Sequence, residues 1–341
     1  MKTKIILASI AFTVIFALGS KAQTALTSEM LNQFEFRNLG AYRAGAWVSA
    51  VAVPENPGAK YKYTFFVAGR NGGVWKTVNN GTTFYPVFEK YGVTTIGAIA
   101  VAPSNPDVVW VGTGESYNAR SSFAGNGVYR STDGGETYTN MGLKDSHHIA
   151  KIIIDPSNPD IVYVASMGHL FSTNAERGVF KTTDGGKTWE KVLYVDDKTG
   201  VIDLVIDPTN PSVLYASAYE KTRLPWHFEA GGKGSAVYKT TDGGKNWVKT
   251  LNGLPGGELG RIGLAISRSN PSIVYAVVEN LNPKDPAKAL QTEGMMNTSR
   301  DNYYDQLKGG EVYRSDNAGQ LWKKMNENKY NVSSKAAYSF N

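Results

Sequence analysis

One eight-residue pattern recurs five times along the chain, and it constrains the fold more than any other feature. The pattern reads Ser/Thr-x-Asp/Asn-x-Gly-x-x-aromatic. Its copies are STDGGETY (131–138), TTDGGKTW (182–189) and TTDGGKNW (240–247), with two weaker ones, TVNNGTTF (77–84) and SDNAGQLW (315–322). A unit repeated at intervals of tens of residues predicts a repeat architecture.

Each copy belongs to a longer unit. A short apolar segment that ends in a basic residue precedes it, as in GVFKT (178–182), and a run such as IDPSNPDIVYVAS (154–166) lies further upstream. Asn-Pro and Asp-Gly turn signals divide the unit into four short strands. Four antiparallel strands repeated around an axis are typical of a β-propeller. We therefore predict an all-β protein, a β-propeller with four-stranded blades.

The number of repeats leaves two arrangements open. Five units are complete, and the spacing from each repeat to the next first strand places the start of a sixth at 336–341. This spacing favours part of a larger propeller. The alternative is a closed five-bladed ring, in which residues 33–39 or the C-terminal tail complete a blade.

The Asp or Asn of each repeat has a structural explanation. Its side-chain oxygen can accept backbone N–H bonds within its own turn, while glycine supplies the positive φ angle. The terminal aromatic residue anchors packing between sheets. We therefore assign a structural role to the five box residues, Asn79, Asp133, Asp184, Asp242 and Asn317.

The N-terminus has the form of a signal peptide. Lys2 and Lys4 precede an apolar run (5–18), and Ser20-Lys21-Ala22 matches the small-x-small cleavage rule. We predict a signal peptide at 1–22, a lead-in segment at 23–45 and the propeller at 46–341. The protein is then exported to the periplasm, the cell surface or the medium, with no transmembrane segment after cleavage.

The composition argues against nucleic-acid binding and excludes disulfide bonds. Loss of the three lysines in 1–22 lowers the net charge from +6 to +3, which gives no case for nucleic acid. The chain has no cysteine, so packing must stabilise an exported fold without disulfides.

Length variation is concentrated in the loops after the second strand of each unit and between units, which share one face of a propeller. Insertions on one face of a repeat protein mark its binding face. All four histidines fall there. The candidate ligand-binding residues are Arg43, Arg70, Tyr117, Arg120, His147, His148, His169, Arg223, Trp226, His227 and Arg261. No metal is assigned, because no His-x-x-x-His spacing occurs and the adjacent His147 and His148 cannot easily share one ion.

Glycan hydrolysis would need two carboxylates facing each other across the channel. The candidates by position are Glu115, Asp203, Glu220 and Glu258, and Trp47, Tyr117 and Trp226 could stack on sugar rings. No nucleophile motif, phosphate loop or nucleotide fingerprint appears, so no cofactor is expected.

The repeats and their turns resemble the bacterial-neuraminidase-repeat, or Asp-box, propellers. This group includes sialidases, xyloglucan-cleaving hydrolases, the sortilin N-terminal domain and photosystem-assembly propellers. The strings FRNLGAYRAGAWVSAVAV (36–53), GGVWKT (72–77) and VWVGTGES (109–116) are also similar to exported Bacteroidota proteins of glycosyl-hydrolase-like or sortilin-N-terminal-like type. The region 36–45 has no Arg-Ile-Pro segment, which sialidases carry. The resemblance implies a propeller with a tendency toward glycans.

Two functional hypotheses follow. The first is an exported propeller that binds or hydrolyses a polysaccharide or oligosaccharide on the face of the long loops. The alternative is a non-catalytic, sortilin-like propeller that binds a protein or peptide there, or an envelope scaffold. The long loop at 279–310, with its Met and Tyr pairs, fits an adaptable contact surface.

Overall fold

The computed structural model describes residues 27–31, 47–119, 122–288 and 306–326. The chain divides into two compact units, residues 1–39 and 40–341. Within the described part of the first unit, helix α2 (Ser28–Leu31) has its Met30 amide bonded to the Thr27 hydroxyl at 3.2 Å. The predicted signal peptide and the predicted sixth strand at 336–341 lie outside the described residues, and the domain boundaries stay predictions.

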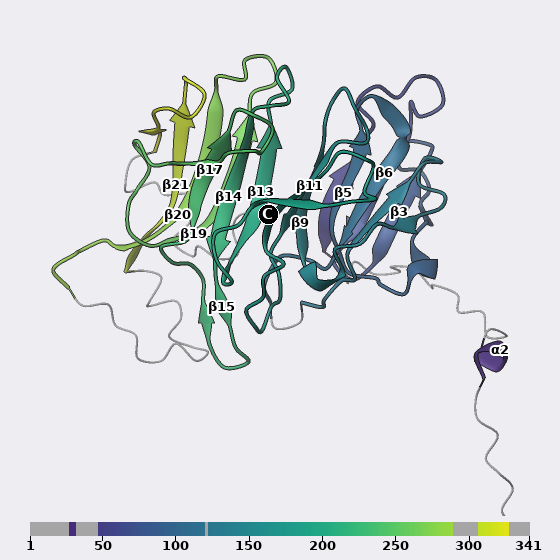
Figure 1. Cartoon of the computed structure of the whole chain (residues 1–341), viewed down its shortest axis with the longest axis horizontal. Helices are drawn as coiled ribbons and strands as arrows, with labels where there is room; N and C mark the ends of the chain where they lie inside the picture. The colour runs from purple at the N-terminus through teal and green to yellow at the C-terminus, as the bar shows by residue number, and fades with distance from the viewer. Residues whose placement is uncertain (1–26, 32–46, 120–121, 289–305, 327–341) are drawn as a thin grey trace, which may run out of the picture. The chain divides into compact units, whose positions relative to one another are not determined.

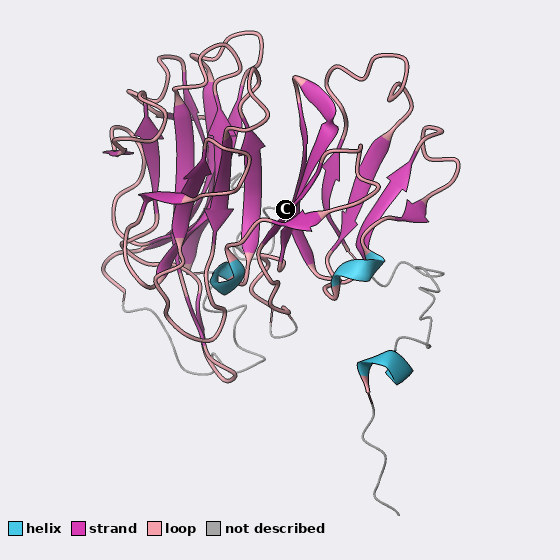
Figure 2. Ribbon diagram, turned by 45° about the vertical axis from the view of Figure 1, so that its right-hand side comes forward, coloured by secondary structure: helices cyan, strands magenta, loops and turns pink. Residues whose placement is uncertain are grey.

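The described part of the second unit contains five four-stranded antiparallel sheets (Figures 1 and 2). Each sheet follows chain order, apart from an insertion in the fourth. The first consists of β1 (Val48–Ala52), β2 (Phe65–Gly69), β3 (Gly73–Thr77) and β4 (Tyr85–Pro86). The second consists of β5 (Ile96–Ala102), β6 (Asn105–Thr113), β7 (Val128–Ser131) and β8 (Thr139–Asn140). The third consists of β9 (Ile149–Ile154), β10 (Val162–Ser166), β11 (Gly178–Thr182) and β12 (Glu190–Leu193).

The last two sheets repeat this plan. The fourth consists of β13 (Thr199–Ile206), β14 (Leu214–Glu220), β17 (Ala236–Thr240) and β18 (Val248–Thr250). The fifth consists of β19 (Leu259–Ile266), β20 (Val274–Pro283), β21 (Leu307–Ser315) and β22 (Lys323–Lys324). Between β14 and β17 a separate hairpin is inserted, formed by β15 (Thr222–Arg223) and β16 (Phe228–Glu229). Two single turns of 3-10 helix, η1 (Glu89–Tyr91) and η2 (Lys144–Ser146), connect successive sheets.

The first strand of each sheet faces the next sheet, as the inner strand of a propeller blade does. Strand β1 contacts β5, β5 contacts β9, β9 contacts β13, and β13 contacts β19. The approach is close: a Cβ added to Gly97 on β5 would lie 2.0 Å from the Ile149 carbonyl oxygen on β9. The prediction of an all-β propeller with four-stranded blades is confirmed.

The hydrophobic core lies between consecutive blades. Each of its four clusters joins two neighbouring sheets; Phe66 and Val109 share one, and Trp110 and Val164 share the next. Two sheets packed face to face must each bury one face, and the sequence supplies apolar residues on both. A blade is therefore stabilised mainly by its neighbours.

The box turns are closed by their own side chains. The Asp133 carboxylate accepts the Ser131 hydroxyl at 2.7 Å and the amides of Glu136 and Thr137 at 3.0 Å. The Thr137 hydroxyl donates to the second carboxylate oxygen at 2.5 Å. Partial burial acts to raise the pKa of Asp133, but these hydrogen bonds lower it to about 2.

The box with asparagine keeps the same geometry. The Asn79 oxygen accepts the Thr83 amide at 2.9 Å, and its NH₂ group donates to the Thr83 hydroxyl at 2.9 Å. Asparagine therefore replaces the carboxylate by reversing one hydrogen bond, since a hydroxyl both donates and accepts. The second glycine of a box also permits close packing: Gly186 has φ +92°, and a Cβ there would lie 2.6 Å from the Trp110 ring.

The basic residue before each of the first four boxes contacts the next blade at or beside its box, whereas Arg314, before the fifth box, pairs with Asp316 of its own box. Arg130 lies beside the third box and pairs with Asp160 at 2.6 Å. Lys181 donates to the Gly243 carbonyl in the fourth box at 2.7 Å, and Lys239 donates to the Ala318 carbonyl in the fifth at 2.7 Å. We call this contact the inter-blade latch, and it explains why a base recurs at this position.

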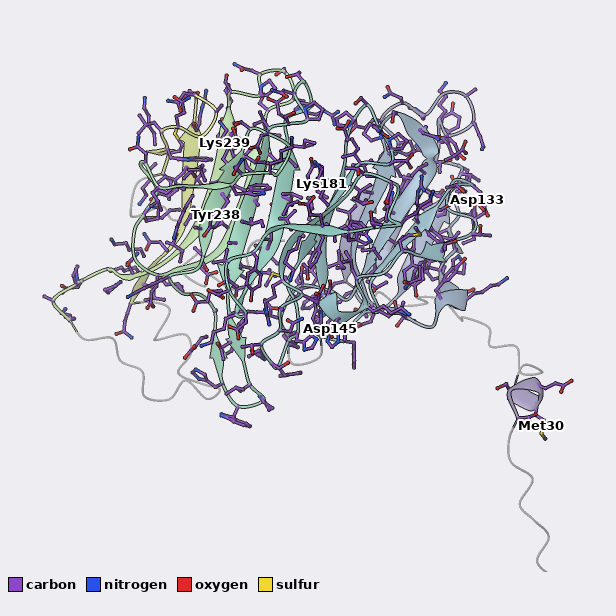
Figure 3. All side chains as sticks on the ribbon, in the orientation of Figure 1. Met30, Asp133, Asp145, Lys181, Tyr238 and Lys239 are labelled. Carbon is purple, nitrogen blue, oxygen red and sulfur yellow. The ribbon has the colours of Figure 1, made fainter. Side chains whose placement is uncertain are left out.

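The two ends of the blades differ. Lys181 and Lys239 lie toward the box end, whereas Asp145 lies at the opposite end (Figure 3). The β15–β16 hairpin protrudes from that opposite end (Figure 1). Among the described residues, no helix combines the length and hydropathy that crossing a bilayer requires.

Candidate functional site

The end of the blades from which the β15–β16 hairpin protrudes carries the loops that the sequence predicted as the binding face. We call it the loop face. It includes the loops after β2, β6, β10 and β14, which hold the described candidate residues Arg70, Tyr117, His169, Arg223, Trp226 and His227. Because one strand order recurs in every blade, loops between equivalent strands meet at the same end.

An aromatic and cationic platform forms where the first two blades meet on this face. The Arg70 guanidinium lies over the Trp47 ring, 5.0 Å from its centroid, and 5.6 Å from that of Tyr117. The Trp47 and Tyr117 rings meet edge to face at 6.3 Å. Trp47 remains 59% exposed although it is a large aromatic residue. Arg70 is buried, so the surface that the three residues offer to solvent is mostly aromatic.

Glu115 is fully buried beneath this platform. One carboxylate oxygen accepts Arg70 Nε at 3.0 Å and the Ser122 hydroxyl, and the other accepts the Tyr117 amide at 2.6 Å. Sequence reasoning proposed Glu115 as a candidate catalytic acid. That assignment stays a prediction; in the structure Glu115 holds Arg70 and the Tyr117 backbone in place, because a buried carboxylate needs such partners.

Arg261 connects the fifth blade to the same loop. It lies on β19, and its guanidinium donates to the Ser116 carbonyl in the second blade. Burial raises the pKa of the neighbouring Tyr117, and the Arg261 charge opposes that shift. The loop after β6 is therefore supported from both the first and the fifth blades.

A second group of buried cations lies under the loops of the third and fourth blades. Arg177 donates to the carbonyls of Met167 at 2.5 Å and His169 at 2.9 Å, and burial lowers its pKa to about 10. Lys221 Nζ also donates to the His169 carbonyl, at 3.1 Å. Burial, together with the positive charges of Arg177, Arg223 and Arg261, lowers the Lys221 pKa to about 7.

The other three candidate acids lie in different surroundings. Asp203, on inner strand β13, accepts the Leu264 amide of the fifth blade at 2.9 Å and pairs with Lys151 at 3.5 Å. Glu220 is partly buried and accepts the Gly234 amide at 2.8 Å. Glu258 is exposed, just before β19. The catalytic assignments stay predictions.

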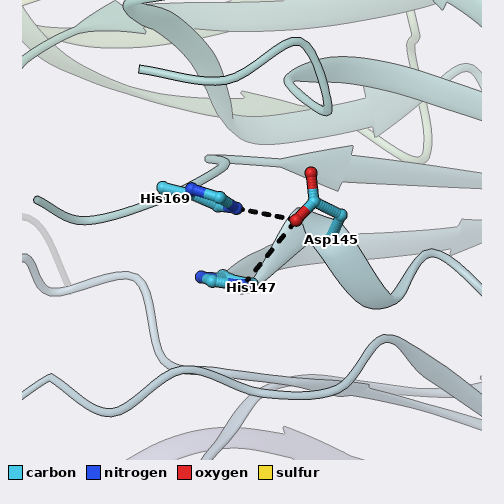
Figure 4. A group of neighbouring side chains, drawn as sticks. All are labelled: Asp145, His147 and His169. Carbon is cyan, nitrogen blue, oxygen red and sulfur yellow. Dashed lines mark hydrogen bonds and ion pairs between the residues drawn. The ribbon is translucent and has the colours of Figure 1, made fainter. Parts of the chain in front are cut away.

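Three side chains at this end gather ligand-type atoms. His169 Nε2 lies 2.9 Å from the Asp145 carboxylate, and His147 Nε2 lies 3.9 Å from the same oxygen (Figure 4). The two imidazole rings stack with centroids 3.8 Å apart. Burial and the nearby His169 charge lower the pKa of His147. Among the described residues, this group has the composition and spacing of a metal-binding cluster.

The remaining histidines are separate from this cluster. His148 is buried, its Nδ1 lies 2.8 Å from the Glu115 carbonyl, and burial lowers its pKa to about 3. His227 pairs with Glu229 at 3.2 Å in the β15–β16 hairpin, close in sequence to Trp226, which is 63% exposed. Arg223 lies in the same hairpin with its guanidinium over the Phe228 ring.

Two candidates, Arg43 and Arg120, lie outside the described residues. Sequence reasoning missed Asp145, Lys221 and Ser116. Asp145 could have been found from the sequence, since a carboxylate two residues before His147 in KDSHH is a potential partner of that imidazole. Lys221 and Ser116 carried none, because their roles depend on which loops meet.

The blades, boxes and loop face define an Asp-box β-propeller. The model of the Sortilin-Vps10 family, described as sortilin, neurotensin receptor 3, matches residues 126–309, more than half of the sequence. The chain belongs to this family.

Curated relatives extend the likeness. Xyloglucanase Xgh74A of Acetivibrio thermocellus is 24% identical over 311 residues, covering 81% of this chain and 33% of that enzyme. A xyloglucanase of Hypocrea jecorina is 24% identical over 257 residues, covering 65% of this chain and 28% of the enzyme. The photosystem II assembly lipoprotein Ycf48 of Picosynechococcus is 29% identical over 130 residues, covering 30% of this chain and 38% of Ycf48. The chain thus spans about a third of the length of these relatives.

Solved structures show the same fold. The GH74 enzyme of Niastella koreensis superposes with a TM-score of 0.55 at 20% identity, covering 81% of this chain and 38% of that one. The GH74 xyloglucanase of Xanthomonas campestris gives a TM-score of 0.55 at 16% identity, covering 82% and 38%.

Proposed function

We propose that this protein is an exported propeller that binds a β-linked plant-type glycan, of the xyloglucan class, on the loop face. The observation that carries the proposal is the Trp47 platform: an exposed indole held by Arg70 and edge-on to Tyr117. A flat, preorganised aromatic surface suits the apolar face of a sugar ring and costs little ordering entropy on binding. The names of the xyloglucanase relatives support this ligand class.

The direct test is titration of xyloglucan oligosaccharides into the full chain by calorimetry. Trp47→Ala is expected to weaken binding by about tenfold or more, because a buried aromatic contact is worth at least ~1.4 kcal/mol. Tyr63→Ala is the matched control, since Tyr63 is another exposed aromatic residue but lies between β1 and β2, near the box end. Equal affinity for the Trp47→Ala variant and the parent would overturn the proposal.

Hydrolysis is a separate question with its own measurement. A glycoside hydrolase needs two carboxyl groups roughly 5 to 9.5 Å apart across the sugar. Release of reducing ends from xyloglucan should be followed for the parent and for Asp203→Asn, Glu220→Gln and Glu258→Gln. Activity lost in one or two of these variants would identify the acids. Binding without any release by the parent would define a binding module.

A second candidate function is peptide binding, and the β15–β16 hairpin favours it. The hairpin protrudes from the loop face (Figure 1) and carries the exposed Trp226. Exposed tryptophans of this kind often anchor protein contacts. The family description names a receptor, neurotensin receptor 3. If Trp226→Ala abolishes capture of a periplasmic or secreted partner while glycan binding is absent, this alternative replaces the first.

A further inference from the structure

The cluster of Asp145, His147 and His169 has the geometry of an open metal site. The ligand-type atoms of all three lie within 4.8 Å of one another. In a tetrahedral zinc site with bonds near 2.0–2.2 Å, neighbouring ligand atoms lie roughly 3.3 Å apart. The distances of 2.9 Å and 3.9 Å from the Asp145 oxygen to the two Nε2 atoms bracket this value. Because the two rings are stacked with nearly parallel planes, one imidazole must also rotate out of the stack for both nitrogens to point at one ion.

His169 is held with Nε2 directed toward Asp145. Its ring Nδ1 lies 2.9 Å from the Ser172 hydroxyl, and its amide donates to the Asn174 side chain at 2.9 Å. The Asn174 NH₂ group then donates to the Asp145 carbonyl at 3.0 Å, so one side chain fixes both segments. Metal-binding histidines usually have such a partner on the other ring nitrogen. The Ser172 hydroxyl can accept a hydrogen bond from Nδ1–H, so it permits the tautomer that leaves Nε2 free for a metal.

His147 reaches the cluster through an unusual backbone. Its φ is +55° and its ψ is −44°, and the His148 amide bonds the Ser146 carbonyl across it at 2.5 Å. This is the strained form of the γ-turn, which is rare for a residue with a side chain. The turn separates the two adjacent histidines: His148 points to the Glu115 carbonyl, while His147 stacks on His169. The sequence argument that His147 and His148 cannot share an ion therefore does not exclude a site built on His147 and His169.

We propose that Asp145, His147 and His169 bind one divalent transition-metal ion of the Zn²⁺ class, through two imidazole nitrogens and one carboxylate oxygen. Imidazole donors favour Zn²⁺ over Ca²⁺ or Mg²⁺, which prefer oxygen ligands. The side chains of Arg177 and Lys221 donate hydrogen bonds to the His169 carbonyl. Their positive charges disfavour a cation that is bound by electrostatic attraction to the carboxylate without coordination by imidazole. Three protein ligands with an exposed carboxylate leave a coordination position open to water or a ligand of the loop face.

The test is calorimetric titration of ZnCl₂ into the full chain, purified without a polyhistidine tag and treated with chelator. One ion per chain is expected near neutral pH, with binding lost in His169→Ala. His147→Gly is the sharper variant, because glycine adopts a positive φ without strain and the fold is kept. His227→Ala is the matched control, since His227 also pairs with a carboxylate on the same face but outside the cluster.

A further variant distinguishes a metal site from a structural His–Asp pair. Ser172→Ala should weaken zinc binding by about 10- to 100-fold while leaving the apo protein folded. Zinc should also raise the melting temperature of the parent but not of His147→Gly, because only a ligand bound to the folded state stabilises it. A folded parent that binds no zinc, or His147→Gly binding zinc as tightly as the parent, would overturn the proposal. Neither outcome bears on glycan binding at Trp47.

Discussion

At the scale of single residues, Glu115 illustrates how burial changes the meaning of a carboxylate. From its place in the chain it reads as a catalytic candidate, yet it lies under the platform with both oxygens hydrogen-bonded. A group in that position organises its neighbours. Its loss should therefore be detected first as a loss of stability.

Glu115→Ala is expected to lower the free energy of unfolding by about 3–5 kcal/mol, because it removes the carboxylate that pairs with the buried Arg70. Glu115→Gln keeps the shape and some of the hydrogen bonds, and should cost less. Urea unfolding followed by tryptophan fluorescence measures both. A Glu115→Ala variant as stable as the parent would contradict this role.

At the scale of the elements, the box turn makes acid sensitivity a property of the repeat. Hydrogen bonds from Thr188 lower the pKa of Asp184, and those from Asn246 lower that of Asp242, as in the Asp133 turn. A depressed folded-state pKa stabilises the protein above the unfolded-state value, about 4, and that stability is lost as pH falls through the folded value.

The triple variant Asp133→Asn, Asp184→Asn and Asp242→Asn should therefore show a flatter stability curve between about pH 4 and pH 2. Its fold should persist at neutral pH, because Asn79 and Asn317 already close two boxes of the same chain. Melting temperatures across this range are the measurement. An equally steep loss in the parent and the variant would assign acid sensitivity to other groups.

The inter-blade latch gives a second prediction at this scale. Lys239→Met removes a charged donor from the Ala318 carbonyl and should cost about 1.5–3 kcal/mol, the usual value of a hydrogen bond to a charged group. Lys323→Met is the control, because Lys323 lies exposed on edge strand β22. If both variants lose the same stability, the latch contributes nothing beyond a surface charge.

The contrast between blades and loops explains what could be predicted from the sequence. The box turns depend on contacts within a few residues, such as that of Asp133 with Thr137. A short stretch of sequence is therefore enough to predict them and the strands that they join. His147 and His169 stack because the loops before β9 and after β10 meet. The γ-turn at His147 also contributes, and no residue pattern in the sequence predicts it. The burial of Glu115 likewise depends on Arg70 arriving from another blade. The box turns could therefore be predicted from the sequence, but the contacts between side chains of different loops could not.

At the scale of the whole molecule, two arginines of the fifth blade reach back to the first two. Arg268, between β19 and β20, pairs with Glu55 of the first blade at 2.5 Å, and Arg261 bonds the Ser116 carbonyl of the second. Arg268 is 68% exposed at its side chain, whereas Arg261 is buried. Both contacts join distant parts of the sequence, but the exposed and the buried arginine should contribute very differently to stability.

Arg268→Ala is expected to change stability by no more than about 1 kcal/mol, with an effect that fades as salt is added. Arg261→Ala should cost more and should also weaken glycan binding, because it releases the loop that carries Tyr117 while leaving Trp47 in place. Chemical unfolding at low and high salt, together with the oligosaccharide titration, separates the two. A larger loss for Arg268→Ala than for Arg261→Ala would reverse this assignment.

The order of the strands also bears on how the chain folds. In the part of the chain that the structure describes, every sheet is made from one continuous stretch of sequence, and each hydrophobic cluster joins consecutive sheets. A chain whose N-terminal part becomes available first can complete one blade before the next has emerged, with low loop-closure cost at each step. Each intermediate then presents one apolar sheet face that awaits the following blade. The time for which that apolar face is open to aggregation is set by how soon the next blade becomes available to cover it.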